Sequence, residues 1–242
     1  MSETLYKFLN DDGSPWSSVS GGGPGTTETW FLPKGKRPGR WMPEIRDIVL
    51  HVRGYRLCRP IGIALGIGPV LYRAEARGEQ LTTGSWVTTG QARLLEHLEA
   101  WNIRTAVLFA ADCAERILPI FEKQKPGDDR VRASLKVLRD FANGKATRDD
   151  LERVWVAGER AWGKCTVRPV TRKSRESTLT KAGDELTWKI ARACWDAAFR
   201  TAGHISWASW TTIHAINALD SGGSNQREYT WQSKRLLHYI QR

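Results

Sequence analysis

Residues 104–123 read RTAVLFAADCAERILPIFEK, and this stretch decides the fold that we predict. It is mostly apolar over several helical turns, which is typical of a helix packed in a protein interior. Pro119 near its end predicts a kink or a stop, because proline removes a backbone donor and clashes with the preceding turn. We therefore expect this segment to be part of a helical bundle.

Helical patterns continue on both sides of this stretch. Arg93 to Trp101 is expected to open the helical part. Asp128 is expected to cap a helix that runs to Asn143 and stops at Gly144. Thr147 and Asp150 resemble a capping box that starts a helix to about Gly163. Three more helices are predicted over 183–203, 205–219 and 229–240. Mostly short loops indicate antiparallel neighbours in a bundle of about six helices.

The front of the chain has a different pattern. Short candidate strands are Thr4–Leu9, Thr29–Leu32, Asp47–Val52 and the alternating run Val70–Ala76. A glycine-rich loop lies within 17–27. The glycines between Gly62 and Gly68 lack the Lys-Ser/Thr of a phosphate loop, and Pro69 and a strand follow them. We predict an α+β fold, with a small β-rich domain over 1–92 and a helical bundle over 93–242.

Composition sets limits on the class of protein. The chain has 242 residues, a net charge of +11 and 40% hydrophobic residues, which fits a globular protein. No apolar run is long enough for a membrane helix, and no secretory signal is visible. We expect a protein of the bacterial cytoplasm. Its four cysteines are far apart in sequence, unlike the close pairs of zinc sites, so we expect no metal and no cofactor.

Nearly half of the net charge falls in one loop. Residues 164–181 carry six basic side chains and one acidic side chain, for a net +5, and Arg168-Pro169 with many Ser and Thr predicts an irregular segment. Such a loop could contact DNA phosphates or an acidic protein surface, or could be a solvated linker. The candidate contacts are Lys164, Arg168, Arg172, Lys173, Arg175 and Lys181.

Tryptophan is unusually frequent, with twelve in the chain. Three pairs occur at spacings that place both members on one helix face: Trp155 and Trp162, Trp188 and Trp195, and Trp207 and Trp210. Core packing is the ordinary explanation. A sharper alternative is an exposed aromatic surface for a partner protein, since tryptophan anchors many interfaces. A third is stacking on single-stranded bases, which predicts tryptophan interleaved with exposed Lys and Arg. The candidate partner contacts are Trp188, Trp195, Trp207 and Trp210.

No catalytic signature is present. Asp112 and Glu115 lie three residues apart on the apolar helix, with Arg116 beside them. A carboxylate pair could perform acid–base chemistry. Such groups more often lie at the edge of a bundle in ion pairs with Arg and Lys, and we favour that interpretation. We therefore expect no enzymatic activity.

The helical half resembles a known family. Residues 110–122 (AADCAERILPIFE), then 128–132 (DDRVR), and residues 191–198 (ARACWDAA) followed by Ala202-Gly203-His204 resemble the helical domain described as an immunity protein in bacterial toxin systems. The resemblance covers roughly 103–215. The basic insert at 164–181 departs from it. The resemblance implies a protein that binds and blocks a toxin or a host factor.

The front half is similar to a short domain of uncharacterised actinobacterial and phage proteins. The matching residues are 5–8 (LYKF), 53–58 (RGYRLC) and 71–79 (LYRAEARGE). With its length and overall character, the whole chain resembles the recombination directionality factors of large serine integrases. That resemblance implies a phage regulator that binds an integrase on DNA and switches recombination from integration to excision. Immunity or anti-defence activity and direct nucleic-acid binding are the alternatives.

Overall fold

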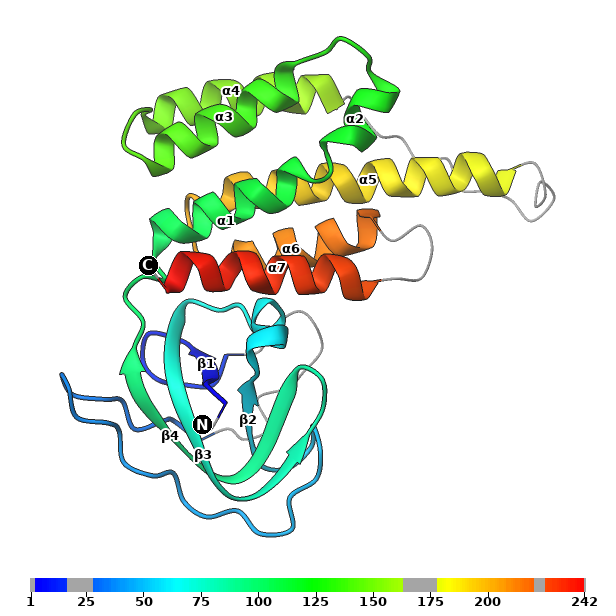
Figure 1. Ribbon diagram of the computed structural model, residues 1–242. Coiled ribbons are helices and arrows are strands. Elements are labelled where there is room, and N and C mark those ends of the chain that lie inside the picture. Colours follow the sequence, from blue (N-terminus) through cyan, green and yellow to red (C-terminus); the bar gives the residue numbers. More distant parts are fainter. Residues whose placement is uncertain (1–2, 17–27, 163–177, 220–224, 242) are drawn as a thin grey trace.

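The computed structural model describes residues 3–16, 28–162, 178–219 and 225–241, which form a small barrel followed by a helical part (Figure 1). The α+β class is confirmed. The elements of the barrel are β1 (Leu5–Leu9), β2 (Tyr55–Cys58), the 3-10 helix η1 (Pro60–Leu65), β3 (Val70–Thr82) and β4 (Trp86–His97). The helices are α1 (Ile103–Glu115), α2 (Leu118–Gln124), α3 (Arg130–Ala142), α4 (Arg148–Trp162), α5 (Thr178–Thr201), α6 (Trp207–Leu219) and α7 (Asn225–Ile240).

The four strands close into an antiparallel barrel in the order β1-β2-β4-β3. Tyr6 pairs with Cys58 on one side of β1 and with Arg73 on the other side. Two predicted strands, 29–32 and 47–52, are not strands. Instead, Gly39, Met42 and Ile45 donate backbone N–H groups to carbonyls of β4 at 2.9 Å. This irregular segment covers the edge of β4 beyond Thr89, where β4 is no longer paired with β2.

Residues 93–97 are the clearest correction to the sequence-based prediction. Arg93 does not open the helical part, because β4 continues to His97. Leucine and glutamate favour helices, but pairing with β3 overrides that preference. Arg93 forms an ion pair with Glu75 at 2.7 Å, and Arg73 forms one with Glu96 at 2.8 Å across the same two strands. The helical part begins at α1, where Asn102 and Thr105 form a capping box.

One hydrophobic core joins the barrel to the helices. It includes Phe8 and Ile63 from the barrel and Phe109 from α1. The 3-10 helix η1 packs on α7, and the amide of Ala64 donates to Ser233 Oγ at 3.4 Å. The division at residue 92 therefore stays a prediction, since the two parts share buried side chains.

Helix α1 is central to the helical part, and it packs against α3, α5, α6 and α7 (Figure 1). The chain turns between α1 and α2, and Pro119 lies in the first turn of α2, where its missing N–H costs nothing. The predicted capping box is confirmed, because Thr147 N donates to Asp150 Oδ2 at 2.8 Å and Asp150 N donates to Thr147 Oγ1 at 3.1 Å. None of the described helices is long and apolar enough to cross a membrane.

An aromatic cluster holds α4 and α5 together. Trp195 is fully buried, with its ring 4.9 Å from Phe199 and 6.4 Å from Trp162. Its indole Nε1 donates to Ser134 Oγ of α3 at 2.9 Å. Gly158 makes this approach possible, because a Cβ there would lie 2.3 Å from Trp195 Cζ2. Core packing thus explains Trp195 and Trp162.

Lys7 is a buried cation in the barrel. Its side chain is buried, and Nζ donates to the Arg56 carbonyl of β2 at 3.1 Å and lies 5.2 Å from the Trp30 ring centroid. Burial lowers the pKa of Lys7 to about 8. A lysine whose pKa is lowered by folding costs stability while the unfolded chain keeps its proton, so the cost falls as pH rises from 8 towards 10.5.

We expect Lys7→Met to remove this pH dependence. The variant should be more stable than wild type near neutral pH, and the difference should shrink by roughly 2 kcal/mol on going to about pH 10. Urea unfolding of both proteins across this pH range would measure it. A difference that stays constant with pH would contradict the buried, pKa-lowered state of Lys7.

Candidate partner-binding groove

A groove lies where α4 meets the corner between α5 and α6. Its volume is about 430 Å³, and its apolar surface comes from Leu151 and Trp155 of α4, Phe199 of α5 and Trp207 of α6. Leu151 and Phe199 are almost fully buried and form a floor, whereas the two tryptophans are partly exposed. The sequence places these residues together because α5 ends at Thr201 and the chain reverses through Gly203 into α6.

Polar contacts fix the aromatic walls of the groove. Trp155 Nε1 donates to Asp196 Oδ1 at 3.1 Å, and Asp196 Oδ2 accepts from Arg200 at 2.6 Å. The guanidinium of Arg200 then lies over the Trp207 ring, 5.0 Å from its centroid. The two walls are therefore linked through one carboxylate and one cation. Such a preorganised site loses little side-chain entropy when a ligand enters.

The rim of the groove carries charge. Arg148 is exposed and donates only a long 3.4 Å hydrogen bond to the Ala202 carbonyl. It forms no ion pair within the parts of the chain that the structure describes. Glu152 and His204 complete the rim. The groove thus combines an aromatic interior with an arginine at its edge that has no ion-pair partner among the described residues, which suits an apolar side chain next to a carboxylate.

The structure separates the four predicted tryptophans. Trp207 lines the groove, and Trp210 is 40% exposed one turn further along α6, with its ring stacked on His214 at 5.6 Å. Trp195 cannot contact a partner, because it is fully buried in the core. The side chain of Trp188 lies outside the described residues. The prediction missed four groove residues, although helical spacing had placed Trp155 on one face with Trp162: Trp155, Phe199, Arg148 and Arg200.

The predicted basic loop falls largely outside the described residues. Helix α5 begins at Thr178, so Lys181 lies in a helix and not in a loop, although its side chain is not described. The remaining candidates lie in the undescribed segment 163–177: Lys164, Arg168, Arg172, Lys173 and Arg175. Contact of this loop with DNA or with an acidic surface stays a prediction.

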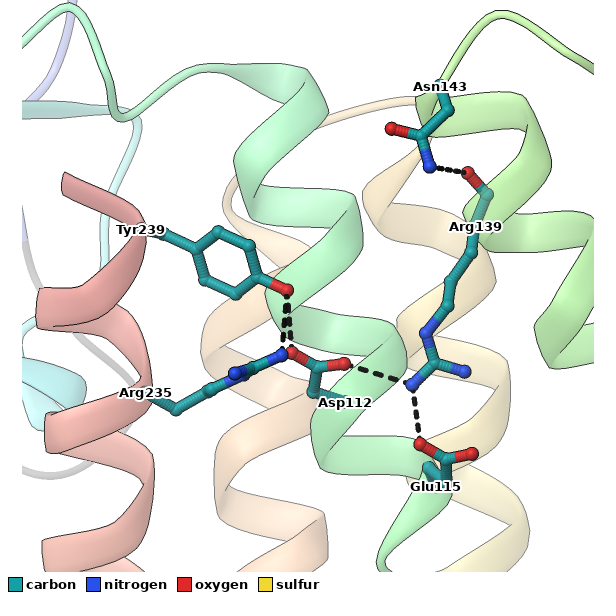
Figure 2. Close-up of polar contacts among 6 residues, drawn as sticks. All are labelled: Asp112, Glu115, Arg139, Asn143, Arg235 and Tyr239. Atoms are coloured by element: carbon teal, nitrogen blue, oxygen red, sulfur yellow. Dashed lines mark hydrogen bonds and ion pairs between the residues drawn. The ribbon is translucent and has the colours of Figure 1, made fainter. Parts of the chain in front are cut away.

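Asp112 is the centre of a charged network between three helices (Figure 2). Its Oδ1 accepts from Arg139 of α3 at 2.9 Å, and its Oδ2 accepts from Arg235 and the Tyr239 hydroxyl of α7 at 2.6 and 2.7 Å. Glu115 accepts from the same Arg139 nitrogen at 2.7 Å. Burial, and then the hydrogen bond to Asp112, raise the pKa of Tyr239 to about 12.

This geometry explains the carboxylate pair that the sequence singled out. Both oxygens of Asp112 already accept strong hydrogen bonds, so neither is free to take a proton from a bound molecule. An ion pair lies nearby, where Arg116 of α1 donates to the buried Glu228 of α7 at 2.6 Å and lies over the Trp231 ring. The Asp112 network and the Arg116–Glu228 ion pair connect α1 to α3 and α7, and we interpret both as structural contacts.

The fold and the groove give a protein with a candidate aromatic binding site on a helical scaffold. A family model described as "Imm-5 like putative immunity protein" matches residues 96–239, more than half of the chain. The chain belongs to this family. The matched range contains the whole groove and the Asp112 network. No curated protein and no solved structure gives a significant match.

Proposed function

We propose that the chain is an immunity-type protein that binds a toxic partner protein through the groove and blocks it in a stoichiometric complex. Family membership supports the class of function. The groove is the observation that identifies where the partner would bind. It places two partly exposed tryptophans and an unpaired arginine at one position within the family range. These residue types are enriched where protein interfaces concentrate their binding energy.

The groove would bind an apolar side chain of the partner between Trp155 and Trp207. Phe199 and Leu151 close its inner end, so the entering side chain would pack against a buried apolar floor. Arg148 at the rim would meet an acidic residue of the partner, and the charge would orient the encounter. Binding of this kind needs no nucleic acid. Blocking then follows if the bound chain covers the functional surface of the partner.

Affinity capture tests this proposal. We would express the tagged full chain in its host, treat the lysate with nuclease, and identify and purify the retained partner. The expected result is a partner that is toxic when expressed alone, harmless with this chain, and bound at one-to-one stoichiometry in light scattering. A recombinase that is retained only when DNA is intact would overturn the proposal. The earlier integrase prediction has no support from the fold, the groove or the family.

Trp207 should contribute most to the binding of the partner. We expect Trp207→Ala to weaken the complex by about 30-fold, or about 2 kcal/mol, because the variant loses one groove wall and its contact with Arg200. Trp210→Ala, outside the groove, should cost about threefold or less, as is typical of interface rims. Isothermal titration calorimetry with the purified partner measures both.

Val52→Ala is the matched control, since Val52 is 71% exposed on the barrel. It should leave the affinity unchanged. An affinity that falls with Val52→Ala but not with Trp207→Ala would place the interface on the barrel and contradict the groove.

A further inference from the structure

A second hollow lies on the barrel, outside the family range. Its volume is about 630 Å³, and it is formed by the segment from Phe31 to Arg40. Lys34, Arg37 and Arg40 line it together with Phe31 and two prolines. In Figure 1 this segment, in blue, runs along the outside of the barrel and apart from the helices. A ligand there would leave the groove between α4 and α6 accessible.

The cations of this segment are exposed and unpaired. Lys34, Lys36, Arg37 and Arg40 are all exposed, and none forms an ion pair with the residues described by the structure. The guanidinium of Arg40 lies over the Phe31 ring, 4.2 Å from its centroid, and its side chain is otherwise exposed. Four like charges within seven positions repel one another, so this arrangement favours an anionic ligand.

The backbone that carries these side chains is held in place before any ligand binds. Lys34 and Arg37 exchange two backbone hydrogen bonds at 3.0 and 3.1 Å, and Gly35 supplies the positive φ of 60° that this turn requires. Pro33 and Pro38 restrict the two arms. Gly39 donates to the Leu94 carbonyl of β4 at 2.9 Å and fixes the segment to the barrel. Little backbone entropy therefore remains to be lost on binding, and the cost that remains is the rotamer freedom of the exposed side chains.

We propose that the Phe31–Arg40 hollow binds the phosphate backbone of a nucleic acid. Arginine N–H groups match phosphate oxygens in paired hydrogen bonds, and lysines contribute flexible positive charge. Beyond the hollow, Arg77 lies over the Trp41 ring at 5.5 Å, next to the acidic residues Glu44 and Glu79. Aromatic rings interleaved with cations are typical of surfaces that bind nucleic acids.

An acidic protein partner fits this surface less well. Lysine is depleted in protein interfaces, and those interfaces have an apolar centre. Here Leu32 is the one large apolar side chain of the segment that is exposed, at 37%. The proposal is independent of the groove and of the immunity-type function, because it concerns the barrel alone.

Fluorescence anisotropy of the full chain tests the proposal. The probes are a labelled single strand of DNA, the same sequence as RNA, and the duplex, each titrated between about 50 and 200 mM salt. The test variant is Lys34→Ala/Lys36→Ala/Arg37→Ala. It should lower the affinity for the preferred probe by about tenfold at low salt and reduce the slope of log K against log salt by about 2.

The control variant removes the same charge from the helical part. Lys123→Ala/Lys125→Ala/Lys145→Ala changes three exposed lysines and leaves the hollow intact. It should keep the affinity within about twofold, since only charges near the bound phosphates release counterions. Arg168→Ala/Arg172→Ala/Lys173→Ala/Arg175→Ala tests the basic insert separately.

Four results would overturn the proposal. One is the absence of binding to every probe at low salt. Another is an equal loss of affinity in the test and control variants. The third is competition by polyglutamate at the same charge concentration as the nucleic acid, which would indicate an acidic peptide ligand. A loss confined to the variant of the basic insert would also overturn it, because the contact would then lie outside the hollow.

Discussion

Asp112→Ala should destabilise the protein by about 3 kcal/mol, because it leaves two arginines and a tyrosine without their shared acceptor. The carboxylate is 9% exposed and accepts three hydrogen bonds from α3 and α7. Arg139 and Arg235 are 27% and 37% exposed, so water recovers part of the loss. That places the expected cost at the lower end of the range for broken buried ion pairs. Urea unfolding measures it.

Glu115→Gln is the matched control for this network. Glu115 accepts from the same Arg139 nitrogen, but its side chain is 49% exposed. A surface ion pair of this kind contributes about 1 kcal/mol or less. Equal losses from the two variants would show that the central position of Asp112 between three helices does not matter.

Trp195→Ala should cost about 4 kcal/mol, the largest effect among the core aromatics that we consider. The ring is fully buried between Trp162 and Phe199, and its removal also leaves Ser134 Oγ without its indole donor. Gly158 offers no side chain to fill the space. Trp195→Phe should recover part of the stability, because a smaller ring fills part of the cavity but lacks the indole N–H. Thermal and urea unfolding would measure both variants.

Trp210→Ala is the control for tryptophan loss itself. Trp210 is 40% exposed, and its removal creates no cavity, so the cost should stay under about 1 kcal/mol. A cost for Trp195→Ala as small as that of Trp210→Ala would contradict the position of Trp195 in the core.

Local signals in the sequence predicted most of the helical part. The capping pair Thr147 and Asp150, the stop at Gly144 and the break near Pro119 each depend on neighbouring residues alone, and each is present. Residues 93–97 could not be predicted in this way. They are held in β4 by backbone pairing with β3, to which two ion pairs add, and the partners lie about twenty residues earlier in the chain.

The candidate site was predicted only in part, for a related reason. Helical spacing marked Trp155, Trp195 and Trp207, but spacing gives the face of one helix and not what covers that face. Gly158 allows α5 to approach α4, so Trp195 is covered while Trp155 and Trp207 stay partly open. The sequence predicted that Asp112 forms ion pairs with Arg or Lys, but it did not identify which residues these are. The partners Arg139 and Arg235 lie on helices whose packing the sequence does not specify.

Hydrogen–deuterium exchange of the purified complex tests the groove most directly. The measurement compares the free chain with the chain bound to its captured partner after nuclease treatment. We predict protection at the start of α4, from Arg148 to Trp155, and around the corner from Phe199 to Trp207, with exchange in the barrel unchanged. Protection confined to the barrel, or none in these two segments, would contradict binding of the partner through the groove.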